Sequence, residues 1–122
     1  MKILKLKIAN GDTIEIKQLD EEHYACPVCG SFGYGQPWFE AEGDSFAGPS
    51  FDICPCCKVQ YGLEDSVGDT SQTGALDKRW EELRIQWLNK MDWAAWALEQ
   101  LKDNLGVETH EIERKGGRKP SA

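Results

Sequence analysis

The sequence predicts an α+β protein in which a β-hairpin, a cysteine-rich ribbon and a helical hairpin follow one another along the chain. Three observations predict this class. Apolar and polar residues alternate over the first 18 residues, two C-P-x-C turns lie at 26–29 and 54–57, and apolar residues recur at helical spacing over 75–106. With 122 residues, the chain has the length of one domain, so we expect the helices to pack on the β part.

The first element is a predicted β-hairpin. Leu6 and Ile8 alternate with lysines, and Ile14 and Ile16 alternate with polar residues. A three-residue loop at 10–12 sets Ile8 opposite Ile14 and Leu6 opposite Ile16, whereas a two-residue Asn-Gly loop would split the apolar face. We therefore predict the three-residue loop, with the lysines on a solvated outer face.

Five cysteines follow the hairpin: Cys26, Cys29, Cys54, Cys56 and Cys57. An odd number without an export signal argues against a disulfide framework. The gap of two residues in each C-P-x-C turn lets both sulfurs point at one ion about 2.3 Å away, and two such turns form the ligand set of a zinc ribbon. We predict that one Zn²⁺ per chain is bound by Cys26, Cys29, Cys54 and Cys57.

The residues around the two turns support this prediction. Gly30 permits a positive φ after the first turn, while Lys58 takes the same place after the second and brings a positive charge. Cys56 is the spare cysteine, and it is either a small filler, a redox-sensitive thiol or a substitute ligand. His23 could also substitute as a ligand, but an ordinary surface histidine is the favoured interpretation. Thiol redox chemistry and bound iron are the competing interpretations, but a redox C-P-x-C pair opens a helix, and neither pair here does so.

The cysteine segments resemble a known family. The stretches Tyr24-Ala25-Cys26-Pro27-Val28-Cys29-Gly30 and Phe51-Asp52-Ile53-Cys54-Pro55-Cys56-Cys57, with Tyr61-Gly62-Leu63-Glu64-Asp65, are similar to the bacterial cysteine-rich CPCC proteins, which are small and zinc-ribbon-like. The resemblance covers about a third of the chain, from Tyr24 to Asp65. The order of the CPCC and C-P-x-C turns is reversed here. The resemblance implies metal binding at Cys26, Cys29, Cys54 and Cys57 and implies no activity.

Loops surround the second turn. In the segment between the turns, Trp38, Phe39 and Phe46 are expected to cover the ribbon. After the second turn, Glu64 to Gly74 reads as an acidic loop. Its carboxylates, Glu64, Asp65 and Asp69, lack the spacing of a calcium loop, so we expect them to be solvated.

Two helices are predicted after Gly74. The first apolar stripe consists of Leu76, Trp80, Leu83, Trp87 and Met91, and the second of Trp93, Trp96, Ala97, Leu101 and Leu105. One uninterrupted helix would leave wide tryptophan-rich faces uncovered, so we favour two packed helices with most tryptophans in the core. Asp92 is the expected N-cap between them, and Gly106 is suited to end the second helix.

We expect a single zinc-ribbon-containing domain at 1–113, with the hairpin at 1–18, the ribbon at 22–66 and the helices at 75–106. Four of the 14 basic residues lie in a tail at 114–122, which we expect to be disordered. This leaves ten basic against 21 acidic residues before the tail, a net charge of −11.

Residues 1–113, with this negative charge, repel phosphate backbones. Nucleic acid is therefore disfavoured as a partner. No membrane-spanning or signal-peptide segment is recognised, and we expect a cytoplasmic protein. The sequence favours a non-enzymatic role: a structural zinc site and a surface that binds another protein, with a basic partner suiting the charge. The alternative is a thiol redox sensor or enzyme that uses Cys56 and labile zinc.

Overall fold

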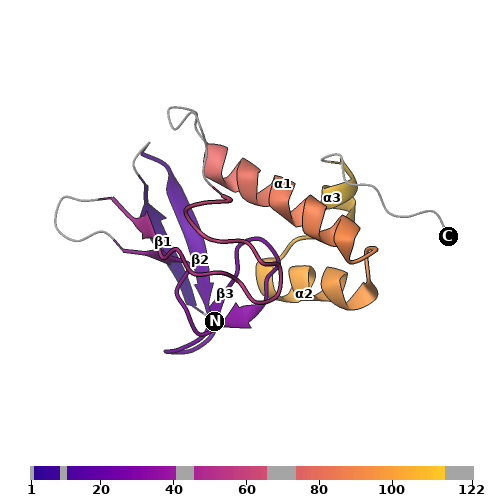
Figure 1. The fold of residues 1–122 in the computed structure, drawn as a ribbon, viewed down its shortest axis with the longest axis horizontal. Coiled ribbons are helices and arrows are strands. Elements are labelled where there is room, and N and C mark those ends of the chain that lie inside the picture. Colours follow the sequence, from indigo (N-terminus) through magenta and orange to yellow (C-terminus); the bar gives the residue numbers. More distant parts are fainter. Residues whose placement is uncertain (1, 9–10, 41–45, 66–73, 115–122) are drawn as a thin grey trace.

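The structure, a computed structural model, describes residues 2–8, 11–40, 46–65 and 74–114. Within these ranges the strands precede the helices, which confirms the α+β class with an N-terminal antiparallel sheet and a C-terminal helical part (Figure 1). The elements are β1 (Lys2–Lys7), β2 (Thr13–Gln18), β3 (Tyr24–Ala25), β4 (Phe32–Gly33), β5 (Trp38–Phe39), β6 (Gly48–Pro49), α1 (Ala75–Lys90), α2 (Ala95–Leu105) and α3 (Thr109–Arg114).

β1 and β2 form the predicted hairpin, but the predicted register is wrong by two residues. Leu6 lies opposite Ile14, whereas the sequence placed it opposite Ile16. A shift of two residues keeps every side chain on its own face of the sheet, because side chains alternate with a period of two. Leu6, Ile14 and Ile16 therefore still share one buried face.

The position of the loop explains the register. Ile8 and Asp12 close the hairpin, since the N–H of Ile8 donates to the carbonyl of Asp12 at 2.9 Å. The loop thus has the predicted three residues but starts one residue earlier. Gly11, with φ 92°, takes its last position, where a three-residue loop requires a left-handed residue that glycine adopts most easily.

The sheet continues into the first cysteine turn. Gln18 pairs with Tyr24, and β3 pairs with β4, so the strand order is β1-β2-β3-β4 and the turn at 26–29 lies between β3 and β4. The second turn, at 54–57, lies likewise between Ile53 and Gln60, which form an antiparallel bridge. In the segment between the turns, where we expected a loop, β5 and β6 form a separate two-stranded sheet.

The aromatic residues of that segment differ from expectation. Trp38 is half-buried and packs against the core. Phe39 and Phe46, however, expose 50% and 49% of their surfaces, so the prediction that they cover the ribbon is wrong.

The helical region contains the two predicted main helices rather than one, and the structure adds the short helix α3. The buried residues of α1 are those of the predicted stripe except Met91, together with one more leucine: Leu76, Trp80, Leu83, Trp87 and Leu88. Trp93 is also buried, as expected for most of the tryptophans of this region. Trp96 departs from the prediction with 51% exposed surface.

Left-handed residues separate α1 from α2. Asp92 and Trp93 have φ of 51° and 54°, and the N–H of Trp93 donates to the carbonyl of Leu88 at 2.9 Å. Such a bond across five residues ends a helix in the Schellman manner. Ala94 takes the N-cap position of α2, so the prediction of Asp92 as N-cap is wrong. Gly106, with φ 70°, ends α2 as predicted.

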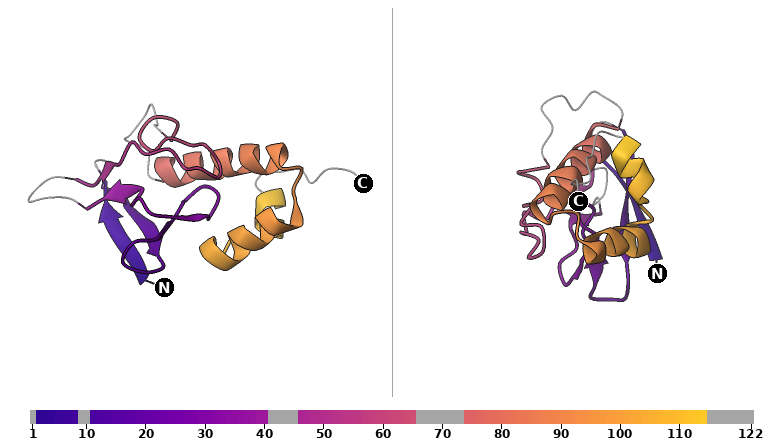
Figure 2. Two further views of the ribbon diagram at one scale, coloured as in Figure 1. Left: turned by 60° about the horizontal axis from the view of Figure 1, so that its bottom comes forward. Right: turned by 90° about the vertical axis from the view of Figure 1, so that its right-hand side faces the viewer.

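One hydrophobic cluster joins the sheet, the cysteine turns and the helices. In Figure 1 and in the left view of Figure 2, the sheet lies toward one end of the molecule, and α1 and α2 lie next to each other and extend toward the other end. Among the described helices, none combines the length and apolar composition needed to cross a bilayer. The single-domain division stays a prediction, and most of the tail, 115–122, lies outside the described residues, as does Asp69.

Candidate metal centre

Four of the five cysteine side chains converge on one point. The sulfurs of Cys26, Cys29, Cys54 and Cys57 all lie within 4.8 Å of one another. Across the two turns, the Sγ atoms of Cys26 and Cys57 are 3.7 Å apart, as are those of Cys29 and Cys54. A tetrahedral site with metal–sulfur bonds of about 2.3 Å separates its sulfurs by about 3.8 Å. The two distances across the turns match this value, so the four cysteines could hold one metal ion, and all five cysteines are free.

The two turns have the same backbone geometry, and we call them knuckle 1 (residues 26–30) and knuckle 2 (residues 54–58). In each, the residue four places after the first cysteine donates its N–H to that cysteine's carbonyl, at 2.9 Å for Gly30 and 2.8 Å for Lys58. In each, the first cysteine donates its own N–H to the carbonyl five places on, at 2.9 Å. Gly30 and Lys58 both have positive φ, 82° and 66°. Two equivalent turns therefore supply two sulfurs each.

Polar side chains surround the sulfurs. The Ser31 hydroxyl lies 3.3 Å from the sulfur of Cys29 and 3.4 Å from that of Cys54, so it can donate to either as a thiolate. Tyr61 is buried beside the cluster, and burial, followed by the neighbouring sulfur of Cys26, raises the pKa of its hydroxyl. Tyr61 therefore stays protonated and keeps a donor next to the sulfurs.

The sulfurs perturb one another strongly. Contact with the sulfur of Cys26 is the largest influence raising the pKa of Cys29 and of Cys57, whereas hydrogen bonding from Cys26 and its neighbours lowers the pKa of Cys54. Adjacent thiolates repel, so the cluster alone keeps protons on part of its sulfurs. A divalent cation removes this penalty and lets all four ionise. The donor set thus fits a thiolate-binding metal ion.

The helices bind knuckle 1 through four consecutive carbonyls. Arg84 of α1 donates to the carbonyls of Pro27 and Val28, at 2.6 and 2.9 Å. From α2, Gln100 donates to the carbonyl of Cys29 and Asn104 to that of Gly30, both at 2.8 Å. Because each of these carbonyls receives a side-chain donor, the helical part fixes the position of knuckle 1.

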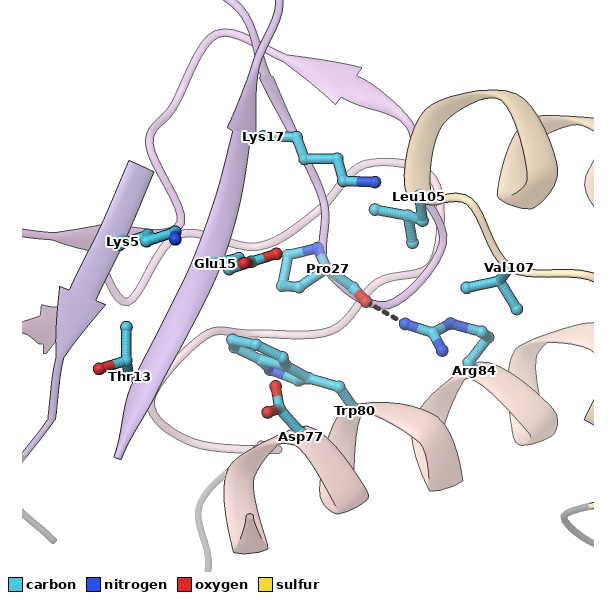
Figure 3. A pocket seen from close by; sticks show the side chains of 10 residues that line it. All are labelled: Lys5, Thr13, Glu15, Lys17, Pro27, Asp77, Trp80, Arg84, Leu105 and Val107. Carbon is cyan, nitrogen blue, oxygen red and sulfur yellow. Dashed lines mark hydrogen bonds between the residues drawn. The ribbon is translucent and has the colours of Figure 1, made fainter. Parts of the chain in front are cut away.

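Arg84 also brings a positive charge to the site. Burial lowers the pKa of its guanidinium, while nearby acids and the sulfurs of Cys26 and Cys29 act in the opposite direction. Figure 3 shows the guanidinium reaching the carbonyl of Pro27. Four thiolates and a divalent ion carry a formal charge of −2, so this half-buried cation offsets part of the excess negative charge.

A hollow of about 670 Å³ lies between the outer face of the hairpin and α1 (Figure 3). Its charged lining is mixed: Lys5, Lys17 and Arg84 against Glu15 and Asp77. The half-buried Arg84 already donates to knuckle 1. The hollow therefore adjoins the metal site through Arg84. The outer face of the hairpin is solvated as predicted, since Lys5, Lys7 and Glu15 are exposed.

The other candidate ligands lie outside the four-sulfur cluster. Cys56 is half-buried, and its sulfur accepts a long contact of 3.9 Å from Gln100. His23 binds Asp20 at 2.7 Å, and the backbone N–H of Glu22, followed by His23, lowers the pKa of that carboxyl. His23 is thus engaged with a carboxylate rather than with the sulfurs.

The expectation that Asp65 is solvated is wrong. Its side chain is 1% exposed and accepts hydrogen bonds from the indole N–H groups of Trp38 and Trp80, at 3.1 and 3.0 Å, and from the backbone of Gly62. Three donors compensate for the loss of water around this carboxyl group. Asp65 therefore ties β5 and α1 to the segment that follows knuckle 2. Glu64, by contrast, is exposed as expected.

Sequence reasoning missed several residues around the sulfurs. Ser31 directly follows the first C-P-x-C-G turn, so its position next to the sulfurs could have been inferred. Arg84, Gln100 and Asn104 act on residues 56 to 74 positions away, and no local pattern distinguishes them from ordinary polar residues of a helix surface.

Comparisons with known proteins give no relative for this chain: no family model, no curated protein and no solved structure matches it. The resemblance to the CPCC proteins consequently stays a prediction that rests on the quoted residues. The case for a function depends on the geometry of the site.

Proposed function

We propose that this chain is a zinc-binding protein whose four-cysteine site is structural and of the zinc-ribbon type, and that the protein acts as an interaction module for another protein. The observation that carries the proposal is the pair of equivalent knuckles, whose sulfurs are 3.7 Å apart across the cluster. Zinc bound there would cross-link the two knuckles.

A structural role is favoured because the site is closed. Four thiolates fill a tetrahedron and leave no position for water or substrate, whereas a catalytic zinc keeps one. In addition, side chains from both main helices bind the carbonyls of knuckle 1, so the metal-bound turn is part of the core. Zinc is the proposed ion because tetrahedral thiolate sets select zinc or iron–sulfur chemistry, and neither iron nor sulfide is needed to account for this arrangement.

The proposal is tested by metal analysis of protein purified under reducing conditions. We expect one zinc per chain, and we expect chelation to abolish the far-UV circular dichroism of the helices, because the folding of such sites is coupled to metal binding. A protein that is free of metal and yet folds cooperatively would contradict the proposal.

Cysteine variants supply a matched control. Cys54→Ser and Cys57→Ser remove a proposed ligand, and each should lose zinc. Cys56→Ser makes the same chemical change one residue away, outside the cluster, and should keep one zinc per chain. Equal loss of zinc in all three variants would show that the assignment of the ligands is wrong.

The competing proposal is a redox sensor that uses Cys56 with labile zinc. Neither knuckle opens a helix in the described structure, so the helix dipole that activates redox C-P-x-C pairs is missing here. A sensor should release zinc under mild oxidant and take it up again on reduction, and Cys56→Ser should abolish this response. Retention of zinc under the same oxidant favours the structural role.

A further inference from the structure

Two adjoining hollows lie beside knuckle 1, on the side of β3 and β4. They measure about 390 and 530 Å³, and four residues line both of them: Tyr24, Tyr34, Gly35 and Asp52. We call the combined depression the aromatic groove. Cys26 and Cys54 line the part next to the metal site, so the groove shares a wall with the four-sulfur cluster.

The groove presents aromatic side chains to solvent. Tyr34 exposes 76% of its surface and Phe39 exposes 50%, and the ring of His23 packs against Tyr34 with centroids 4.5 Å apart. Tyr24 and Phe32 are half-buried at its sides. Exposed aromatic residues grouped around a depression are typical of the anchors of protein interfaces.

The charge of the groove is of one sign. Glu21, Glu22 and Asp52 line it, and among the residues that the structure describes no lysine or arginine lines either hollow. Gly35 lets the Asp52 carboxylate approach the backbone, since a Cβ at position 35 would lie 2.7 Å from its Oδ2. Carboxylates next to aromatic faces suit a cation, which is attracted both by the charges and by the rings.

We propose that the aromatic groove binds a lysine- or arginine-bearing peptide segment of a partner protein. This inference rests on the proposed function as an interaction module and identifies the groove as the surface that binds the partner. The cation lies against the Tyr34 ring and pairs with the acidic rim. Because the knuckles form one wall, the groove is held in shape before binding, which lowers the entropic cost of association. Phosphate backbones are excluded by the same carboxylates.

The test uses a fluorescein-labelled dodecapeptide of alternating lysine and glycine, with a glutamate–glycine peptide as the negative probe. Fluorescence anisotropy with zinc-loaded protein should show binding of the lysine peptide alone. Tyr34→Ala should weaken binding about tenfold without changing the net charge. The double variant Glu21→Gln, Glu22→Gln should weaken it to a similar degree.

A second double variant controls for diffuse attraction to an acidic protein. Glu99→Gln with Asp103→Asn removes the same charge from exposed positions of α2 that do not line the groove, and binding should change less than about threefold. Equal weakening by the two pairs, an unchanged affinity in Tyr34→Ala, or no binding of the lysine peptide would overturn the inference. So would self-association of the free protein that Tyr34→Ala abolishes, since a second copy would then occupy the groove.

The zinc content of each sample separates this inference from the proposed function. One zinc per chain without peptide binding contradicts the inference about the groove. Peptide binding by folded, metal-free protein contradicts the structural metal site and supports the groove.

Discussion

Arg84 is the residue that connects the helices most directly with the metal site. It is half-buried, and it donates to the two carbonyls of knuckle 1 that lie between the first pair of cysteines. Arg84→Met removes both donors and the charge, so we expect a loss of about 3 kcal/mol in the free energy of unfolding. Zinc affinity, measured by competition with a chelator, should fall at least about tenfold.

Arg79→Met is the matched control for Arg84, because it makes the same change on α1. Arg79 pairs with Glu82 at 3.2 Å and donates to the carbonyl of Glu64 at 3.0 Å, outside knuckle 1, so Arg79→Met should cost only about 1 kcal/mol. Similar losses of stability in the two variants would mean that the contact of Arg84 with knuckle 1 does not stabilise the fold more than an ordinary surface contact does.

Asp65 provides a second test at the scale of single residues. Asp65→Ala leaves the indole N–H groups of Trp38 and Trp80 without their acceptor, and we expect a loss of about 3 kcal/mol in urea denaturation. Its exposed neighbour serves as control, since Glu64→Ala should change stability by less than about 0.5 kcal/mol. An effect of Asp65→Ala as small as that of Glu64→Ala would refute the buried network.

Asp77 gives the fold a dependence on pH. Asp77 lies at the edge of the hollow between α1 and the hairpin, where partial desolvation, followed by the charges of Asp12, Glu81 and Glu15, raises the pKa of its carboxyl group. The native state then binds this proton more tightly than the unfolded chain does, so stability falls as the pH rises from about 4 through the raised pKa. The charged form is present at pH 7, where the full destabilisation applies.

Asp77→Asn should therefore raise Tm by only about 1 °C at pH 7, because solvent screens the charge of an exposed carboxylate, and the gain should shrink as the pH is lowered toward 4.5. The exposed Asp103→Asn is the control and should show no such trend. A gain in Tm that is constant with pH, or a loss at pH 7, would show that the ionised carboxyl group is not disfavoured in the fold.

At the scale of elements, the two knuckles differ at one equivalent position. Lys58 holds the left-handed conformation that Gly30 holds in knuckle 1. A side chain there costs about 1 kcal/mol, so Lys58→Gly should stabilise the zinc-loaded protein by about that amount in urea denaturation. A loss of stability would indicate that the Lys58 charge next to the thiolates outweighs the backbone strain.

The converse change, Gly30→Ala, should destabilise by more than backbone strain alone. Its Cβ would lie 3.2 Å from the carbonyl oxygen of Gln100 and 3.3 Å from Leu105, where α2 packs on knuckle 1. Gly11→Ala is the control, because Gly11 also has positive φ but has nothing within 4 Å of such a Cβ. Equal losses of stability in the two variants would show that α2 does not pack tightly against knuckle 1.

The elements were predictable where a local pattern dictates them. The alternation of apolar and polar residues predicted the hairpin, and apolar residues at helical spacing predicted the two main helices. Gly106 predicted the end of α2. The register of the hairpin depends on which loop residue adopts a positive φ. A three-residue loop that starts at residue 9 or at residue 10 keeps the same apolar side chains on one face, so matching the faces could not decide between the two. The α1–α2 break is formed by Asp92 and Trp93 in left-handed conformations; aspartate adopts this conformation more often than most residues, but tryptophan gives no such signal.

For the whole molecule, the sequence predicted the four sulfurs but not what surrounds them. Cysteine spacing is a local signal, because each pair must point at a common ion. The contacts of α1 and α2 with knuckle 1 join distant segments, as does the bond between Asp65 and Trp38, and they depend on tertiary packing. The composition showed that the protein is acidic. It did not show that acidic and aromatic side chains line the same groove.

The central claim is that four sulfurs from two equivalent knuckles bind one zinc ion. X-ray absorption at the zinc edge measures the ligands directly, and the Cys56→Ser variant removes the fifth sulfur from consideration. We predict a first coordination shell of four sulfurs at about 2.3 Å. A shell that contains nitrogen or oxygen in place of a sulfur, or protein that retains no zinc in this variant, would contradict the account.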